Sequence, residues 1–399
     1  MARPVRISCV RCLVVLCVLA TAIYSGSSAV HAQQVSSSSG TSASDATAVS
    51  TGNLINWFDC SSLDAKDLPT AQCAQYKAPL CYEGICEDAK KRTIDVFVKR
   101  VQAKDDPETK PNVWFLQGGS SAALPTMEVA MTSLYTQFNG GVNVYTMDRR
   151  GSSRGTRLDC IATQVTTSGS PNARDLGIDE VSSCAEELEI KFGKDLSAFS
   201  ITSAATDIST FISKYQSGSK TFVYGVSYGS ALVERLMHLD TKEIVGYVLD
   251  GVSTTSGADV KDGMYMSNWD VNFGEVGEIF LSLCSSDPKC SSRFPTRSIQ
   301  ETLKQSINES SREVPCSEVY RFGGNDRLRG VQNVLGTLLA NPETRGIIPA
   351  ILYRTNRCNS DDFNLFYKFM GIGLKSLLTA SDDSASNSTL LHYLTVFSE

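Results

Sequence analysis

Hydrophobic and polar residues alternate through the middle of the chain in a pattern that predicts strands and helices in turn. Short apolar segments rich in β-branched and aromatic residues predict strands at 93–101, 112–119, 142–148, 221–225 and 244–250. Apolar residues at helical spacing predict helices at 124–138, 204–216 and 230–239. Strands and helices that alternate through short glycine-containing turns predict an α/β fold with a doubly wound, mostly parallel sheet.

The two ends of the chain have different patterns. Residues 1–32 begin with arginines, continue with the apolar run LVVLCVLATAI and end in small residues, as in a secretory signal peptide cleaved after Ala32. Residues 33–52 are rich in Ser and Thr without apolar periodicity, and predict a flexible leader. We expect the α/β core to begin in residues 53–254 and residues 255–399, with their helical apolar spacing, to form a separate helical segment.

Charge and length limit the partners of the mature protein. The chain has 399 residues and a net charge of −6, which argues against nucleic acid or an anionic membrane surface as a partner. No stretch approaches the length of about 18 apolar residues that a membrane-spanning helix needs, so we expect no membrane anchor after signal cleavage.

Cysteine usage agrees with export to an oxidising compartment. Three of the 13 cysteines lie in the predicted signal peptide, and the remaining even number allows up to five disulfides. The sequence does not determine their connectivity, although Cys160 with Cys184 and Cys284 with Cys290 are plausible local pairs. No repeated C-x-x-C and no H-E-x-x-H motif is present, so we expect no metal and no cofactor.

Two N-x-S/T triplets, at Asn308 and Asn387, are candidate sites for N-linked glycans. Such triplets are common by chance, and they add only slightly to the prediction of a secreted, extracellular protein.

The segment 225–229 has the G-x-S-x-G spacing, with Ser227 at its centre. A predicted strand leads into it and an amphipathic helix leads out, which is the context of a nucleophile elbow. Side chains at Gly225 or Gly229 would clash with neighbouring backbone in such a turn. The alternative is an ordinary strand-to-helix turn in which Ser227 caps the helix.

A serine nucleophile also needs N–H donors at the position where negative charge develops. One would be the backbone N–H of Tyr228, directly after the nucleophile. The other would come from the turn after the strand at 112–119, which contains Gly118 and Gly119. A plain βα turn is the alternative for this second segment.

Four segments in this order, GVSYGS, AATDISTFISKY, FLQGGSS and MDRRGSSRGTRLDC, resemble the α/β-hydrolase fold. More narrowly, they resemble secreted serine peptidases of family S33, the proline-iminopeptidase and tripeptidyl-aminopeptidase-like enzymes, over roughly residues 76–252. The resemblance implies Ser227 as nucleophile, Gly118, Gly119 and Tyr228 around the oxyanion, and residues 255–399 as a helical cap inserted over the active site. It also implies a structural turn, with the family's D-x-R-G pattern, at Asp148, Arg150 and Gly151.

The chain departs from this pattern at two positions. Ser120 stands where the family usually has proline after the two glycines, and Ser153 stands at the second glycine of the D-x-R-G-x-G turn. Both departures weaken the expectation of a complete oxyanion site.

The triad acid and base are not identifiable. His238 lies eleven residues after Ser227 on the same predicted helix, about 16 Å along its axis, and we expect it on the helix surface or at the edge of the core. His392 lacks the preceding strand and glycine-rich turn that present the base, and Asp250 ends a strand where family members carry a similar LDG without using it. They are weak candidates for base and acid. In the family, the acid and base lie on strands that follow the cap, so we expect the last core strands to be absent and the chain to be C-terminally truncated.

The predicted function is therefore a secreted serine hydrolase of the aminopeptidase type. It would release short peptides or single residues from free N-termini through an acyl-enzyme at Ser227. An esterase or lipase on the same fold is one alternative, because the fold does not choose the bond that is cleaved. A catalytically inactive secreted fragment or binding protein is another, because the triad acid and base are missing. The expected partner is a peptide or ester substrate.

Overall fold

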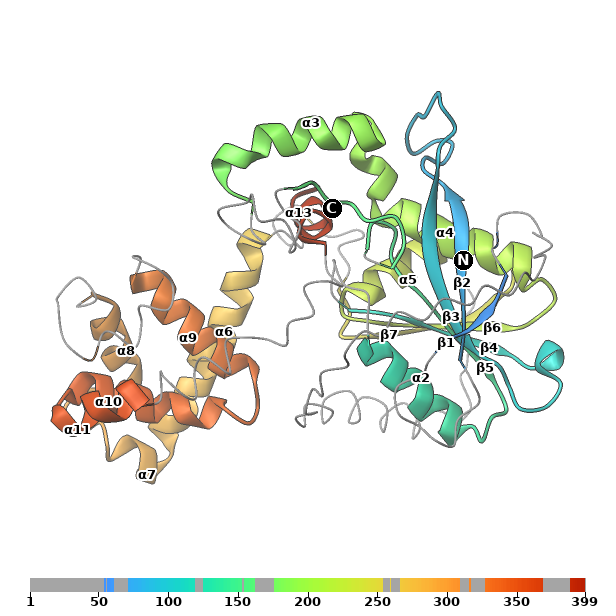
Figure 1. Cartoon of the computed structure of the whole chain (residues 1–399). Coiled ribbons are helices and arrows are strands. Elements are labelled where there is room, and N and C mark those ends of the chain that lie inside the picture. The colour runs from blue at the N-terminus through green and yellow to red at the C-terminus, as the bar shows by residue number, and fades with distance from the viewer. Residues whose placement is uncertain are drawn as a thin grey trace, which may run out of the picture. The chain divides into compact units, whose positions relative to one another are not determined.

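The structure is a computed structural model that describes residues 54, 56–60, 71–118, 125–152, 154–161, 176–253, 259, 266–308, 316, 327–368 and 388–398. The chain divides into two compact units (Figure 1): residues 1–264 with 384–399, here the sheet unit, and residues 265–383, here the helical unit. The predicted signal peptide, the predicted leader, Gly119 and Asn387 lie outside the described residues.

The sheet unit contains one seven-stranded sheet in the order β1-β2-β3-β5-β4-β6-β7. Its strands are β1 (Phe58–Cys60), β2 (Ala71–Pro79), β3 (Thr93–Val101), β4 (Asn112–Leu116), β5 (Asn143–Met147), β6 (Thr221–Val226) and β7 (Ile244–Asp250). Strands β5, β4, β6 and β7 are parallel, whereas β1, β2, β3 and β5 pair in antiparallel fashion. The register places Leu116 opposite Gly225 and Val226 opposite Asp250, so the carboxyl ends of β4, β6 and β7 meet at one edge.

Both faces of the central strands are buried, because helices cover each side (Figure 1). Trp114 and Leu116 belong to the core beneath α4 (Ile201–Tyr215) and α5 (Tyr228–Leu239), to which α3 (Val181–Phe192) also contributes buried residues. Phe115 faces the other way and belongs to the core beneath α2 (Pro125–Gln137). This explains why β4 and β5 are mostly apolar, as buried parallel strands are. Short 3₁₀ segments lie at Pro107–Thr109, Ile178–Glu180 and Leu196–Phe199.

The helical unit has a core of its own. Its elements are α6 (Met266–Ser286), α7 (Pro288–Ser291), α8 (Ile299–Asn308), α9 (Arg327–Ala340), a 3₁₀ segment (Arg345–Ile347), α10 (Ile348–Arg357) and α11 (Ser360–Lys368). Leu281, Ile299, Val334, Leu338 and Leu352 are buried at its centre. The predicted helical segment 255–399 differs from the structure at its end, because the last helix, α13 (Thr389–Ser398), belongs to the sheet unit, where Leu391 is fully buried.

The predicted α/β class is confirmed, and so are the five predicted strands and three predicted helices, whose ends differ from the observed ones by no more than three residues. Strands β1 and β2 and helix α3 were not predicted. The sequence of β2, AQCAQYKAP, lacks β-branched residues and mixes small with polar side chains, so it carries no clear strand signal. Within the described residues the sheet ends at β7.

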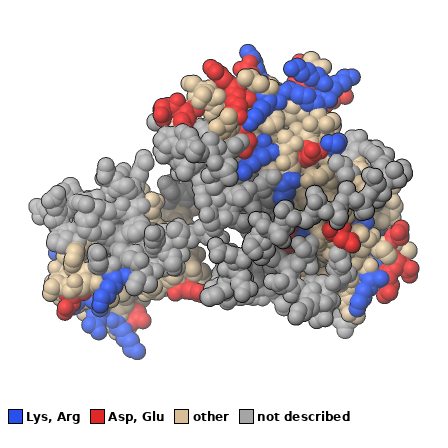
Figure 2. All heavy atoms as spheres, in the orientation of Figure 1, with Lys and Arg blue, Asp and Glu red and all other residues tan. Residues whose placement is uncertain are grey.

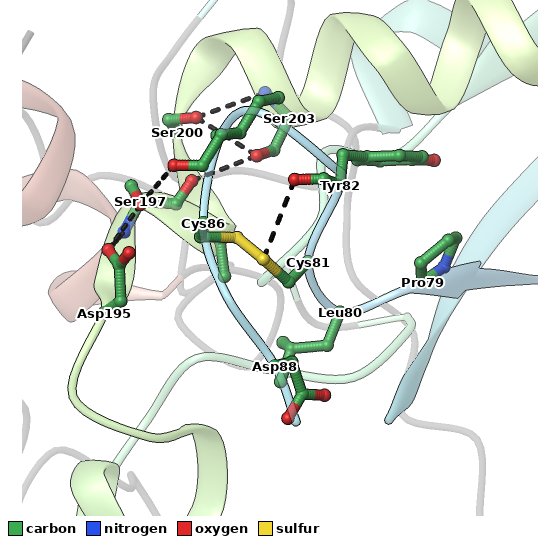
Figure 3. Close-up of a disulfide and its surroundings, with 12 residues drawn as sticks. Pro79, Leu80, Cys81, Tyr82, Cys86, Asp88, Asp195, Ser197, Ser200 and Ser203 are labelled. Atoms are coloured by element: carbon green, nitrogen blue, oxygen red, sulfur yellow. Dashed lines mark hydrogen bonds between the residues drawn. A yellow bond between two sulfur atoms is a disulfide. The ribbon is translucent and has the colours of Figure 1, made fainter. Parts of the chain in front are cut away.

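Five disulfides join the ten cysteines that follow the predicted signal peptide. They are Cys60–Cys73, Cys81–Cys86, Cys160–Cys184, Cys284–Cys290 and Cys316–Cys358. The two local pairs expected from sequence are among them. Figure 3 shows Cys81–Cys86 beside Ser200, the residue that caps α4 by accepting a hydrogen bond from the Ser203 N–H. Among the helices that the structure describes, none has the length and hydrophobicity needed to cross a bilayer.

Candidate active site

Ser227 lies in the turn between β6 and α5, and its backbone has a conformation that non-glycine residues rarely adopt. Its φ is 53° and its ψ is −122°. Its N–H donates to the Asp250 carbonyl at 2.8 Å, and its own carbonyl accepts from the Ser230 N–H at 2.8 Å and hydroxyl at 2.6 Å. The Ser227 side chain makes no capping hydrogen bond to α5, which argues against an ordinary capped turn. A strained residue held from both sides is typical of functional positions.

The two glycines of the turn have no room for a side chain. A Cβ at Gly225 would lie 2.2 Å from the Gly229 carbonyl oxygen, and a Cβ at Gly229 would lie 2.3 Å from the Leu116 carbonyl oxygen. The close approach of α5 to the ends of β4 and β6 therefore requires glycine at both positions.

Gly118 brings the end of β4 against the serine. A Cβ there would lie 3.0 Å from the Ser227 Cβ and 3.6 Å from its Oγ. The Tyr228 N–H belongs to the first turn of α5, where N–H groups have no acceptor within the helix and the helix dipole favours negative charge. Ser227 Oγ thus lies between the backbone after β4 and the positive end of a helix.

Arg149 connects three parts of the sheet unit around this turn. Its guanidinium carbon lies 4.9 Å from the centre of the Tyr228 ring. Its Nη1 donates to Thr395 Oγ1 of α13 at 2.5 Å, and its Nη2 donates to the Phe199 carbonyl at 3.0 Å. Sequence reasoning missed this residue.

The turn after β5 contains Asp148, Arg150 and Gly151. Asp148 accepts from Arg154 through both carboxylate oxygens, at 2.7 and 2.5 Å, and Arg154 Nη1 also donates to Glu128 at 2.7 Å. Burial raises the pKa of Asp148 despite the neighbouring Arg154. Gly151 has a φ of 87° and packs against Phe199 and Leu391. These contacts shape the end of β5.

Arg150 is almost completely buried, and all five of its N–H donors are used. Nε and Nη2 donate to the two oxygens of Asp207 at 2.7 and 2.6 Å, while the remaining donors reach the carbonyls of Pro79, Leu80 and Ala198. Burial alone would lower the pKa of Arg150, but the Asp207 carboxylate outweighs it and raises that pKa. The Tyr82 hydroxyl donates to Asp207 at 2.7 Å. Arg150 therefore holds three segments together.

The candidate acid and base occupy different surroundings. The Asp250 carboxylate accepts from the Tyr224 hydroxyl at 2.6 Å, and burial together with this carboxylate raises the pKa of Tyr224. His238 is exposed, with its Nε2 2.9 Å from Glu234 Oε1, so the prediction of a surface position is confirmed. His392 lies in α13, where partial burial lowers its pKa. Within the described part of the chain, no hydrogen bond joins the Ser227 hydroxyl to a histidine.

Charges around these elements are mixed in sign. In the view of Figure 2, acidic and basic side chains of described residues are interspersed. In the part of the chain that the structure describes, no group of three or more His, Cys, Asp or Glu side chains is arranged to hold a metal.

No family model and no curated protein sequence matches this chain. The comparison with solved structures gives partial similarities at low identity. A cold-adapted esterase from an Arctic intertidal metagenomic library is 15% identical with a TM-score of 0.27, over 49% of this chain and 65% of the esterase. Alpha/beta hydrolase domain-containing protein 10 from mouse is 11% identical with a TM-score of 0.26, over 45% of this chain and 50% of the mouse protein. A probable hydrolytic enzyme from Pseudomonas aeruginosa is 10% identical with a TM-score of 0.27, over 82% of each chain.

This chain thus spans less than two thirds of the first two of these structures. Its own geometry defines its class. The parallel centre of the sheet, the helices on both faces and the strand–turn–helix elbow at Ser227 are those of the α/β-hydrolase fold.

Proposed function

We propose that this protein is a secreted serine hydrolase in which Ser227 is the nucleophile. The observation that carries the proposal is the backbone of Ser227, held at a φ of 53° in an elbow with Gly118 against its side chain. An elbow of this kind exposes the hydroxyl for attack and places N–H donors beside it. The five disulfides support the proposal of an oxidising, extracellular location.

The reaction proceeds by acyl transfer. Ser227 Oγ attacks the substrate carbonyl carbon while its proton passes to a base, and the resulting oxyanion accepts a hydrogen bond from the Tyr228 N–H. The tetrahedral intermediate collapses with release of the leaving amine or alcohol, which takes up a proton. Water then attacks the acyl ester, releases the carboxylic acid and restores the Ser227 hydroxyl.

The substrate class that we favour is a peptide with a free N-terminus. This choice rests on the resemblance of residues 76–252 to secreted S33 peptidases, of which GVSYGS is the central segment. Cleavage of a tripeptide anilide and of a p-nitrophenyl ester, measured side by side, tests the choice. Turnover of the ester alone would replace the aminopeptidase with an esterase.

A fluorophosphonate probe tests the nucleophile, because it labels only an activated serine. We expect the wild-type protein to be labelled and Ser227→Ala to be unlabelled. Ser213→Ala is the matched control, because Ser213 is an exposed serine on α4 whose hydroxyl donates to Glu243 at 3.2 Å. Equal labelling of Ser227→Ala would refute the proposal, and a folded wild-type protein without labelling would favour an inactive binding protein.

Two histidine variants test the source of the base. We expect His238→Gln to leave labelling unchanged, because its ring pairs with Glu234 at the surface. His392→Gln examines the candidate in α13 under the same conditions. A loss of labelling in the His392 variant alone would assign the base to that helix.

A further inference from the structure

The helical unit contains a cavity of about 560 Å³ that lies among α6, α8, α9 and α10. All of its lining residues belong to the helical unit. Its volume falls within the range of about 300–1,000 Å³ that is typical of sites for small organic ligands. The lining is mainly apolar, and its most deeply buried members are Leu281, Val331, Ile348 and Leu352.

Three glycines inside two long helices keep this space open. Gly274 and Gly277 are in α6, and Gly336 is in α9. A Cβ at Gly274 would meet nothing within 4 Å, and those at Gly277 and Gly336 would meet Leu339 and Phe273 at 3.5 and 3.6 Å, ordinary contact distances. Packing in the protein therefore does not require glycine at any of them, although glycine inside a helix is less stable than alanine.

The polar residues around the cavity indicate the chemistry of this occupant. Among the described residues that line the cavity, Glu278, Gln332 and Asn333 are exposed, Thr337 is half-buried, and none is a lysine, arginine or histidine. The amide side chains offer both donors and acceptors, as a hydroxyl-bearing group requires. The Glu278 carboxylate repels an anionic head group, which is a recognised route to specificity.

We propose that the helical unit binds a neutral single-chain amphiphile. Its alkyl chain lies against the buried apolar lining that includes Leu281 and Leu352, and its hydroxyl-bearing head lies at Gln332 and Asn333. Glu278 excludes fatty-acid carboxylates of the same chain length. This binding is separate from the chemistry proposed for Ser227 and does not depend on it.

Calorimetric titration of the full-length protein with 1-O-decylglycerol and with decanoate, both below micelle-forming concentrations, tests the proposal. The glyceryl ether has no ester bond for a hydrolase to cleave. We expect one ether molecule per chain and at least tenfold weaker binding of decanoate. Shortening the ether chain to octyl should weaken binding about fourfold for each methylene removed. Equal affinity for the ether and decanoate, or non-saturating binding, would overturn the proposal.

Substitution of Glu278 tests the selectivity. Glu278→Gln should strengthen decanoate binding at least fivefold and leave ether binding within twofold. Glu275→Gln is the matched control, because Glu275 is an exposed carboxylate on the same helix that does not line the cavity. If both variants changed decanoate binding equally, a general charge effect would replace the proposed role of Glu278.

A glycine variant tests the cavity itself. Gly277→Ala with Gly336→Ala should raise the Tm by a few degrees through helix propensity, yet weaken ether binding at least tenfold, because the two new methyl groups take up space that the alkyl chain would occupy. Gly346 does not line the cavity, and a Cβ there would meet nothing within 4 Å. Gly346→Ala should therefore leave ether binding unchanged. A more stable double variant with undiminished ether affinity would contradict the assignment.

Discussion

Ser227 and Gly118 depend on each other at the scale of single residues. The serine has a backbone conformation that is unfavourable for a residue with a side chain. Its Cβ lies so close to Gly118 that a residue with a side chain there would be too tightly packed. Hydrogen bonds from the Ser227 N–H to Asp250 and from Ser230 to the Ser227 carbonyl hold this conformation in place. The conformation of Ser227 therefore depends on neighbours outside the G-x-S-x-G segment.

Gly118→Ala should slow fluorophosphonate labelling at least tenfold. The new methyl group would lie 3.0 Å from the Ser227 Cβ and 3.1 Å from the Val226 carbonyl, so the serine or the end of β4 must move. The free energy of unfolding should fall by about 1–3 kcal/mol, as for other overpacked sites. Labelling kinetics and urea unfolding measure the two effects, and an unchanged labelling rate would contradict the close approach.

The sequence predicted the elbow but not every residue around it. The G-x-S-x-G spacing and its flanking strand and helix identify Gly225, Ser227 and Gly229, because a local turn has local sequence requirements. Arg149 has no such signal. Its partner Thr395 is 246 positions away in the chain, and the D-x-R-G pattern selects the neighbouring Arg150 rather than Arg149.

Buried charge joins separate elements of the sheet unit. Asp207 in α4 binds Arg150 in the turn after β5, and the same arginine binds the backbone after β2. Tyr82 completes the cluster, and burial, together with the Asp207 charge, raises the pKa of Tyr76 to about 12. Loss of one member leaves the others buried without their partner.

Asp207→Asn should lower the free energy of unfolding by about 3–5 kcal/mol, because an uncompensated arginine remains in the core. Asp95→Asn is the control, since Asp95 pairs with Lys77 while both side chains are more than 40% exposed. Such a pair contributes about 0–1 kcal/mol. Urea unfolding curves compare the two variants, and similar losses would mean that burial does not set the strength of these pairs.

Acid should weaken the end of the helical unit. The hydrogen bonds that Arg357 donates lower the pKa of the Asp362 carboxyl most strongly. Burial opposes this effect and Arg354 adds to it, and the resulting pKa is about 2. The unfolded value is about 3.9, so this stabilisation is present above about pH 4 and is lost as the pH falls towards 2.

Asp362→Asn should therefore lower the free energy of unfolding by about 1–3 kcal/mol at neutral pH. The difference between the variant and the wild-type protein should shrink between pH 4 and pH 2. Thermal unfolding followed by circular dichroism at several pH values measures this, and a difference that stays constant over that range would disprove the assignment.

Elements were predictable where burial follows the sequence pattern. Strand β4 and most of β6 are buried, although Phe222 near the start of β6 is 41% exposed, and both strands have the apolar, β-branched and aromatic sequences that burial requires. Strand β2 is held by antiparallel pairing to β3. Its Ala and Gln residues fit in the sheet but are not typical of strands, so the sequence carries no strand signal there. The position of α13 was also beyond prediction, because its docking depends on Leu391 and Thr395 meeting residues from distant parts of the chain.

At the scale of the whole molecule, each unit has its own hydrophobic core and its own disulfides. Cys60–Cys73, Cys81–Cys86 and Cys160–Cys184 lie in the sheet unit. Cys284–Cys290 and Cys316–Cys358 lie in the helical unit. The two units are therefore expected to unfold in separate transitions.

Replacing Cys316 and Cys358 by serine should lower the helical unit's stability by about 4 kcal/mol, because this bridge closes a separation of 42 residues. Replacing Cys284 and Cys290, six residues apart, should lower it by about 2 kcal/mol. Differential scanning calorimetry should show one transition shifted and the sheet unit's transition unchanged. A shift of both transitions together would show that the units unfold as one.

The return of the chain to the sheet unit at α13 makes the helical unit an insertion, anchored at its beginning and at its end. A single proteolytic cut within residues 265–383 would not release the helical unit, because each fragment would remain covalently attached to the sheet unit. The same connectivity separates two evolutionary pressures. Residues between the anchors are free to lengthen, shorten or diverge without disturbing the register of the strands around Ser227, so the helical unit can change while the elbow is inherited intact.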